Sequence, residues 1–172
     1  MSTATNSMSV LAEGKTAWIR IEGRANFNSS VDFKALVNGL VEKGYCRFVL
    51  DLTDCVLMDS TFLGVLAGLG MKFNGNRNGG SAPSIELLNP NSRIADLLEN
   101  LGVEHLFKIV SGPELSTNRL QPVEQTPAAR DRKEVSRTCL EAHETLMRIN
   151  PDNISKFKEV TQFLAEDLKK ME

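Results

Sequence analysis

The stretch "VLDLTDCVLMDSTFLGVLAGLG" spans residues 49–70 and joins an apolar strand pattern to a helix pattern rich in small residues. A polar step, Asp59-Ser60-Thr61, stands between the two. Asp59 or Ser60 is a candidate N-cap, because an oxygen of such a side chain accepts from backbone N–H groups that have no partner within the helix. The same helix end would also accommodate a phosphate on Ser60, since its donors and dipole favour an anion. The local pattern does not decide between a cap and a phosphorylation site.

The rest of the first two thirds of the chain alternates between strand and helix patterns. Strands are expected over 16–23, 46–52, 84–89 and 105–110, and helices near 31–43, 60–73 and 90–102. Alternation of this kind builds a largely parallel sheet with covering helices. We therefore predict an α/β fold with a mixed, largely parallel sheet of about four to five strands and helices packed on it.

Finer features of this region follow from single residues. In the first strand, Trp18 and Arg20 are expected on one face, opposite the apolar residues of the other face. Ser29 or Ser30 is a candidate N-cap of the first helix, and Gly44 ends that helix. Residues 1–14 are small and polar and are expected to form a frayed segment or a loosely docked strand, ahead of a domain over 15–112.

The last third of the chain differs in composition and in hydrophobic pattern. Residues 113–128 contain prolines and little apolar content and are expected to form a linker, followed by a helical hairpin over 129–172 that turns at Asn150-Pro151. Apolar positions recur at helical spacing, with Val135, Cys139, Ala142 and Leu146 in the first helix and Ile154, Phe157, Thr161, Leu164 and Leu168 in the second. Such stripes must be covered, by docking on the first domain, by a homodimer through the hairpin, or by another partner.

Composition excludes several classes of protein. The net charge is −2 with no strongly basic segment, so nucleic-acid binding is not expected. No apolar run is long enough to insert into a membrane, and the first residues lack a secretion signal, which favours a cytoplasmic location. The three cysteines, Cys46, Cys55 and Cys139, have no zinc or redox spacing, and His105 and His143 have no metal-ligand pattern. No bound metal and no cofactor are expected.

No arrangement of acid, base and nucleophile stands out, so no catalytic residue and no enzyme activity are expected. One enzyme alternative stays open at this point. Asp51, Asp54 and Asp59 surround one strand end and could hold Mg²⁺ through oxygen ligands. Turn and capping roles for the three carboxylates are the simpler interpretation.

Three stretches together carry a resemblance to a known family. They are "IEGRANFNSS" (21–30), "FVLDLTDCVLMDSTFLGVLAGL" (48–69) and "NPNSRIADLLENLGVEHLFKI" (89–109). They resemble the STAS family, the small domains typified by bacterial anti-sigma-factor antagonists, over about residues 10–112. The second stretch is similar to that family's strand followed by an Asp-Ser-[Ser/Thr]-Gly-Leu-Gly helix start.

The resemblance implies a STAS fold and a non-enzymatic binding switch. In such proteins the serine after the aspartate is phosphorylated by an ATP-dependent serine kinase that doubles as an anti-sigma factor, and a metal-dependent Ser/Thr phosphatase reverses the reaction. Carried over by position, Ser60 is the phosphorylation site, with Thr61 as the poorer candidate. The implied partner-binding residues are Asp59, Ser60, Thr61, Phe62, Leu63 and Gly64.

The chain departs from the family pattern at Phe62, where the family usually has glycine. A phenyl ring there is expected to crowd a partner cleft shaped for glycine, or to anchor the chain in a different cleft. An alternative function is therefore a STAS adaptor or structural subunit that is never phosphorylated, as in lipid-transport or stressosome-like assemblies.

Overall fold

A mixed, mostly parallel sheet forms the centre of the fold, as predicted. The computed structural model describes residues 7–75, 83–113, 117–123 and 132–171. Within them the sheet has the strand order β6-β5-β3-β2-β1-β7, and β4 pairs with β2 outside this series. The strands are β1 (Ser7–Glu13), β2 (Thr16–Ala25), β3 (Arg47–Asp51), β4 (Cys55–Met58), β5 (Ser84–Leu88), β6 (Lys108–Val110) and β7 (Gln121–Pro122). The α-helices are α1 (Phe27–Glu42), α2 (Ser60–Gly75), α3 (Ser92–Asn100), α4 (Arg132–Ile149) and α5 (Ile154–Lys170). No helix in these ranges is long and apolar enough to cross a membrane.

The parallel strands β2, β3, β5 and β6 carry the core. Ile19 pairs with Leu50, and Leu50 with Leu87, so one apolar row crosses the sheet. These three side chains are 0–2% exposed, and burying each contributes about 1.5–3 kcal/mol. The predicted strands over 16–23, 46–52 and 84–89 correspond to these elements. The last strand is shorter than predicted, because residues Glu104–Leu106 form a 3₁₀ turn before β6.

The N-terminal region contributes a full strand to the sheet. β1 pairs antiparallel with β2 from Ser7↔Glu22 to Glu13↔Thr16, and the chain reverses at Gly14, whose φ is +64°. Met8 is 2% exposed and belongs to the core. Of the two expectations for this region, the described residues support a strand rather than a frayed end, and the strand is firmly paired.

The strand β4 was not predicted. Its four residues lie between the turn after β3 and the polar step. They pair in parallel with the end of β2, with a register shift between Gly23 and Arg24. The next backbone N–H, that of Asp59, donates to the carbonyl of Ala25 at 2.9 Å. β4 thus brings the start of α2 beside the start of α1.

The prediction for the start of α1 was wrong by several residues. The N-cap is Asn26, whose side chain accepts from the N–H groups of Asn28 and Ser29, while the Ser29 hydroxyl accepts from the Asn26 N–H. This reciprocal pair is a capping box, which satisfies donors at both ends of the first turn. Ser30 is fully buried and its hydroxyl donates to the carbonyl of Phe27 at 2.7 Å.

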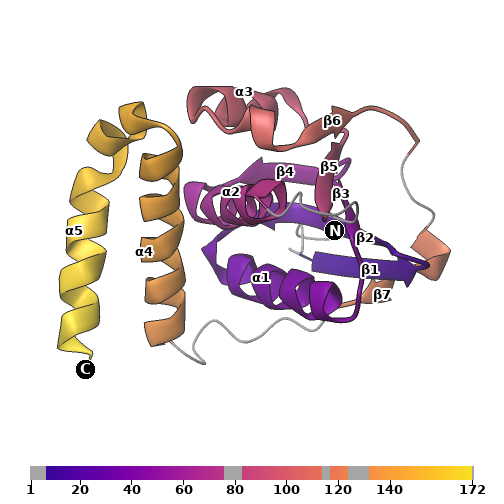
Figure 1. Ribbon diagram of the computed structural model, residues 1–172, viewed down its shortest axis with the longest axis horizontal. Helices are drawn as coiled ribbons and strands as arrows, with labels where there is room; N and C mark the ends of the chain where they lie inside the picture. Colours follow the sequence, from indigo (N-terminus) through magenta and orange to yellow (C-terminus); the bar gives the residue numbers. More distant parts are fainter. Residues whose placement is uncertain (1–6, 76–82, 114–116, 124–131, 172) are drawn as a thin grey trace, which may run out of the picture.

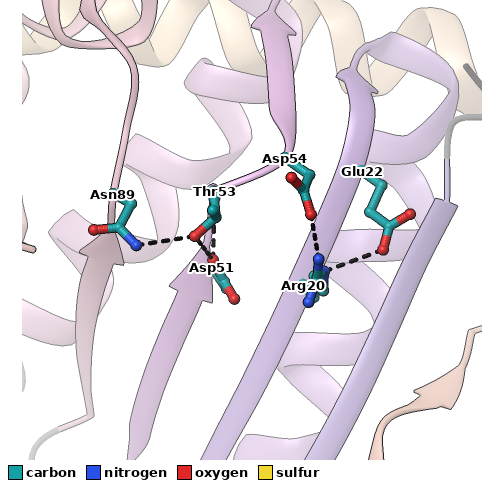
Figure 2. Close-up of polar contacts among 6 residues, drawn as sticks. All are labelled: Arg20, Glu22, Asp51, Thr53, Asp54 and Asn89. Carbon is teal, nitrogen blue, oxygen red and sulfur yellow. Dashed lines mark hydrogen bonds and ion pairs between the residues drawn. The ribbon is translucent and has the colours of Figure 1, made fainter. Parts of the chain in front are cut away.

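The strand β2 is half-buried, as predicted: Ala17, Ile19 and Ile21 are buried on one face, whereas Trp18 on the other face is partly exposed. The departure from the prediction is Arg20. Arg20 is 5% exposed, and its guanidinium forms ion pairs with Glu22 and Asp54 (Figure 2). A buried cation requires such partners, because the cost of removing it from water is otherwise several kcal/mol.

Part of the predicted linker belongs to the sheet. β7 pairs antiparallel with β1 through Val10↔Gln121 and Ser9↔Pro122, and it follows a 3₁₀ turn over Thr117–Arg119. Proline is tolerated here because β7 lies at the edge of the sheet. The other residues of the predicted linker, 114–116 and 124–128, lie outside the described residues.

The C-terminal hairpin is present and docks on the first domain. α4 and α5 pack side by side, joined by the 3₁₀ turn Pro151–Asn153, and α4 lies between α5 and helices α1 and α2 (Figure 1). Ala142 and Leu146 of the predicted stripe are 2% and 0% exposed. In the second helix Thr161 is buried, whereas Ile154 is 46% exposed, so the contacts within the chain leave this part of the predicted stripe uncovered. A homodimer through the hairpin stays a prediction.

Two contacts fix the position of the hairpin. A Cβ built on Gly64 of α2 would lie 2.5 Å from the Ala142 carbonyl oxygen, so the two helix backbones touch there and only glycine fits. At the hairpin turn, the fully buried Asn153 donates through Nδ2 to the carbonyls of Leu101 and Leu146, at 3.0 and 2.8 Å. The first contact holds α4 on α2, and the second holds the turn on the end of α3.

We predict that Gly64→Ala destabilises the chain and that Gly68→Ala does not. The added methyl group at position 64 meets backbone atoms of α4, so the variant should lose about 2 kcal/mol of unfolding free energy or release the hairpin. A methyl group at position 68 meets only the Thr145 Cγ2 at 3.7 Å, so this matched variant should be neutral or more stable by up to about 1 kcal/mol, since alanine favours helix. Urea unfolding measures both changes. Equal stability of the two variants would contradict the described contact.

Candidate functional site

The Asp59 carboxylate joins the N-termini of two helices. Its Oδ1 accepts from the N–H of Phe62 in α2, and its Oδ2 accepts from the N–H of Phe27, the first residue of α1, both at 2.8 Å. Asp59 is thus the N-cap of α2, one of the two candidates that the sequence predicted. A carboxylate suits this position because it can accept from both helix ends and complements both dipoles.

Burial has an electrostatic consequence for this carboxyl group. Desolvation raises the pKa of Asp59, and the hydrogen bonds from Phe62 and Phe27 oppose that shift without cancelling it. Ionisation is therefore less favourable in the folded than in the unfolded chain. The contribution of this group to stability is largest below the ordinary pKa of an aspartate and falls as the pH rises through the raised value.

Ser60 is the first residue of α2 and contacts a histidine of α4. Its Oγ lies 2.8 Å from His143 Nε2, and His143 Nδ1 lies 2.7 Å from the Cys139 carbonyl oxygen. A carbonyl oxygen can only accept a hydrogen bond, so His143 Nδ1 must carry the hydrogen. In the neutral ring Nε2 is then an acceptor, and the Ser60 hydroxyl donates a hydrogen bond to it. The sequence showed no metal-ligand pattern around His143, and the contact with Ser60 was not predicted. No local signal could reveal it, because the two residues are 83 positions apart.

The Ser60–His143 pair has the geometry of a nucleophile and a base, but its surroundings suit a structural role. His143 is 5% exposed, and its ring packs edge-on against Phe157 with the centroids 4.8 Å apart. The pair lies within the interface of α2 and α4, where the hydrogen bond joins the two helices. A nucleophile needs space for its substrate beside the attacking oxygen. Here Ser60 is only partly exposed, and α4 packs against it through His143.

The residues that follow Ser60 in the predicted partner-binding set are buried. Thr61 is 5% exposed and its hydroxyl donates to Cys139 Sγ at 3.6 Å; burial raises the pKa of that thiol. Phe62 is fully buried, and its ring lies 4.8 Å from that of Phe33. The ring thus faces the core, which corrects the expectation that it would crowd or anchor a partner cleft. Leu63 is also fully buried.

The three aspartates considered for Mg²⁺ each have another role. Asp51 is fully buried and accepts from the N–H and hydroxyl of Thr53, at 3.0 and 2.6 Å (Figure 2). Asp54 pairs with Arg20, and Asp59 caps two helices. Within the described parts of the chain, no group of three or more His, Cys, Asp or Glu residues could hold a metal ion. The geometry therefore does not support the magnesium alternative.

Comparison with known families agrees with this architecture. The model of the STAS domain matches residues 8–114. The chain belongs to the STAS domain family. None of the curated proteins matches it in sequence.

Solved structures show the same fold at low sequence identity. The anti-sigma factor antagonist SpoIIAA in its unphosphorylated form is 16% identical, with a TM-score of 0.53 over 62% of this chain and 89% of that one. SpoIIAA of Bacillus in the phosphorylated form, also 16% identical, has a TM-score of 0.51 over 63% and 92%. An anti-sigma factor antagonist from Mycobacterium paratuberculosis is 14% identical, with a TM-score of 0.50 over 64% and 88%. Helices α4 and α5 lie outside the residues that the family model matches.

We predict that Asp59→Asn and Asp59→Ala destabilise the chain by different amounts. Asparagine keeps one acceptor for a helix N-terminus but presents an amide donor to the other, so about 1 kcal/mol should be lost. Alanine removes both caps and should cost about 2 kcal/mol. The free energy of unfolding in urea measures both variants, and an alanine variant as stable as the wild type would contradict the double-cap role.

Proposed function

We propose that this STAS protein is a non-enzymatic, anti-sigma-factor-antagonist-like binding module, switched by reversible phosphorylation of Ser60. The observation that carries the proposal is the position of Ser60, directly after the capping Asp59 and at the first turn of α2. This matches the family's Asp-Ser-[Ser/Thr] step at the same strand-to-helix junction. The occurrence of SpoIIAA in phosphorylated and unphosphorylated forms supports the comparison.

The physical effect of the switch is a change of charge at the helix end. A phosphoryl group adds about −1.5 to −2 charge at neutral pH, which the N–H groups and dipole of α2 tolerate. It would stand beside the Asp59 carboxylate and turn this part of the surface anionic. A partner with acidic or apolar groups against α2 would then be repelled and would pay the desolvation cost of the phosphate.

The proposed partners follow from the family resemblance. An ATP-dependent serine kinase that doubles as an anti-sigma factor would bind the unphosphorylated form, and a metal-dependent Ser/Thr phosphatase would restore that form. The proposed contact region is the start of α2 from Asp59 to Gly64. Its Phe62 and Leu63 side chains lie in the core, so they would support this region from below rather than touch a partner.

A second candidate function is a STAS adaptor that is never phosphorylated. The observation that favours it is the contact of the Ser60 hydroxyl with His143, since the hydroxyl already has a partner within the chain. In this case the surface of α2 would serve only to hold the C-terminal hairpin.

The test is phosphorylation of the purified full chain by an extract of the native cell with ATP, followed by intact-mass and peptide mass spectrometry. We expect a single phosphate on Ser60, its loss in Ser60→Ala, and its retention in the matched variant Thr61→Val. No phosphate in the wild type would favour the adaptor. A phosphate that persists in Ser60→Ala would overturn the assignment of the site.

A further inference from the structure

The helix α4 contacts Ser60, the residue on which the proposed switch depends. Its neutral His143 accepts a hydrogen bond from the Ser60 hydroxyl, and its Cys139 sulfur accepts a hydrogen bond from the Thr61 hydroxyl. Its Ala142 touches the backbone of α2 at Gly64. These three contacts involve three of the six residues predicted to bind a partner. They come from one turn of α4, so a single helix occupies the proposed contact region.

We propose that the start of α2 is a helix-binding surface, that α4 occupies it in cis, and that docking of α4 and a phosphoryl group on Ser60 exclude each other. The inference rests on the proposed function, because it describes the regulation of the same site. An external partner that uses this surface would have to displace α4.

The surface specifies the kind of partner that fits it. Gly64 and Ala142 approach at backbone distance, so a bound helix must present a small residue at that point. The next residue of α4, His143, accepts from Ser60, and Leu146, one turn on, is fully buried. A competing partner is therefore expected to offer an amphipathic helix with a small residue, a hydrogen-bond acceptor beside it, and an aliphatic residue one turn further.

Phosphorylation conflicts with the docked helix for steric and electrostatic reasons. Only one hydrogen-bond length, 2.8 Å, separates Ser60 Oγ from His143 Nε2, whereas a phosphoryl group adds a phosphorus atom and three oxygens to that Oγ. The His143 ring is held in place, because it is 5% exposed, packs against Phe157 and is hydrogen-bonded to the Cys139 carbonyl. The new negative charge would also lie beside the carboxylate of Asp59, the residue directly before Ser60.

The closing experiment needs no kinase. Phosphoserine is inserted at position 60 during translation of the full chain, and amide hydrogen exchange is compared with that of the unmodified protein. We expect the amides of α4 and α5 to exchange faster by roughly tenfold or more, while those of β2, β3 and β5 stay protected. Unchanged or slower exchange in α4, from a phosphate that turns toward solvent or pairs with His143, would overturn the proposal.

The chain offers a matched control for this experiment. Ser92 is also the first residue of an α-helix and also follows an N-cap residue, Asn91, but it is exposed and lies at the end of α3 remote from the hairpin turn. Phosphoserine at position 92 should leave the exchange of α4 and α5 unchanged. Faster exchange in both modified proteins would show a general effect of charge and would overturn the specific role of Ser60.

An engineered disulfide between α2 and α4 makes it possible to test this inference separately from the proposed function. In Thr61→Cys, combined with Cys46→Ser, oxidation should link the introduced thiol to Cys139, because the Thr61 Oγ1 lies 3.6 Å from that sulfur. Oxidised chain should be phosphorylated by the extract much more slowly than the same chain reduced. Equal rates with the disulfide present would overturn the inference alone, as would failure of the disulfide to form. If neither the reduced variant nor the wild type is phosphorylated, that result counts against the proposed function. The hydrogen-exchange experiment then tests the inference by itself.

Discussion

The Asp59 carboxylate is the interaction on which the arrangement of the site depends. It accepts one N–H from the first turn of α1 and one from the first turn of α2, so a single side chain sets the relative position of two helix ends. β4 delivers this residue to its place, because the Asp59 N–H continues the pairing with β2 at Ala25. The hydroxyl of Ser60 then lies at a fixed point on the surface, where helix α4 contacts it.

The second constraint is the close approach of α2 and α4. Helices usually pack with their axes 8–10 Å apart and side chains interdigitated, whereas here the absence of a Cβ at Gly64 lets the backbone of Ala142 touch α2. Such a contact is specific to one register, since the neighbouring Gly68 leaves ordinary space. The hairpin therefore has a defined position, and His143 meets Ser60 as a consequence of that register.

Much of the fold could be predicted from the sequence, because its signals are local. The apolar strands, and the glycine that ends the first helix, mark the parallel core, and Asp59 and Ser60 are recognisable as cap candidates from their position. The four-residue strand β4 was missed, since so short a stretch between two polar turns has no period of its own. The burial of Arg20 was missed because it depends on a pair with Asp54, 34 positions away. The contact of Ser60 with His143 is likewise a product of tertiary packing, and neither residue carries a sign of the other.

The pairing of β7 with β1 has a consequence for the range of the C-terminal hairpin. β7 holds the chain at the edge of the sheet up to residue 122, and α4 begins at Arg132, so a hairpin that left α2 would stay on a short tether. Tethers of this length give effective concentrations on the order of millimolar. A free partner helix at micromolar concentration would thus need an affinity for α2 about a thousandfold greater than that of α4 to compete equally. By anchoring the tether, the edge strand β7 sets the minimum affinity that a competing helix needs to displace α4 from Ser60.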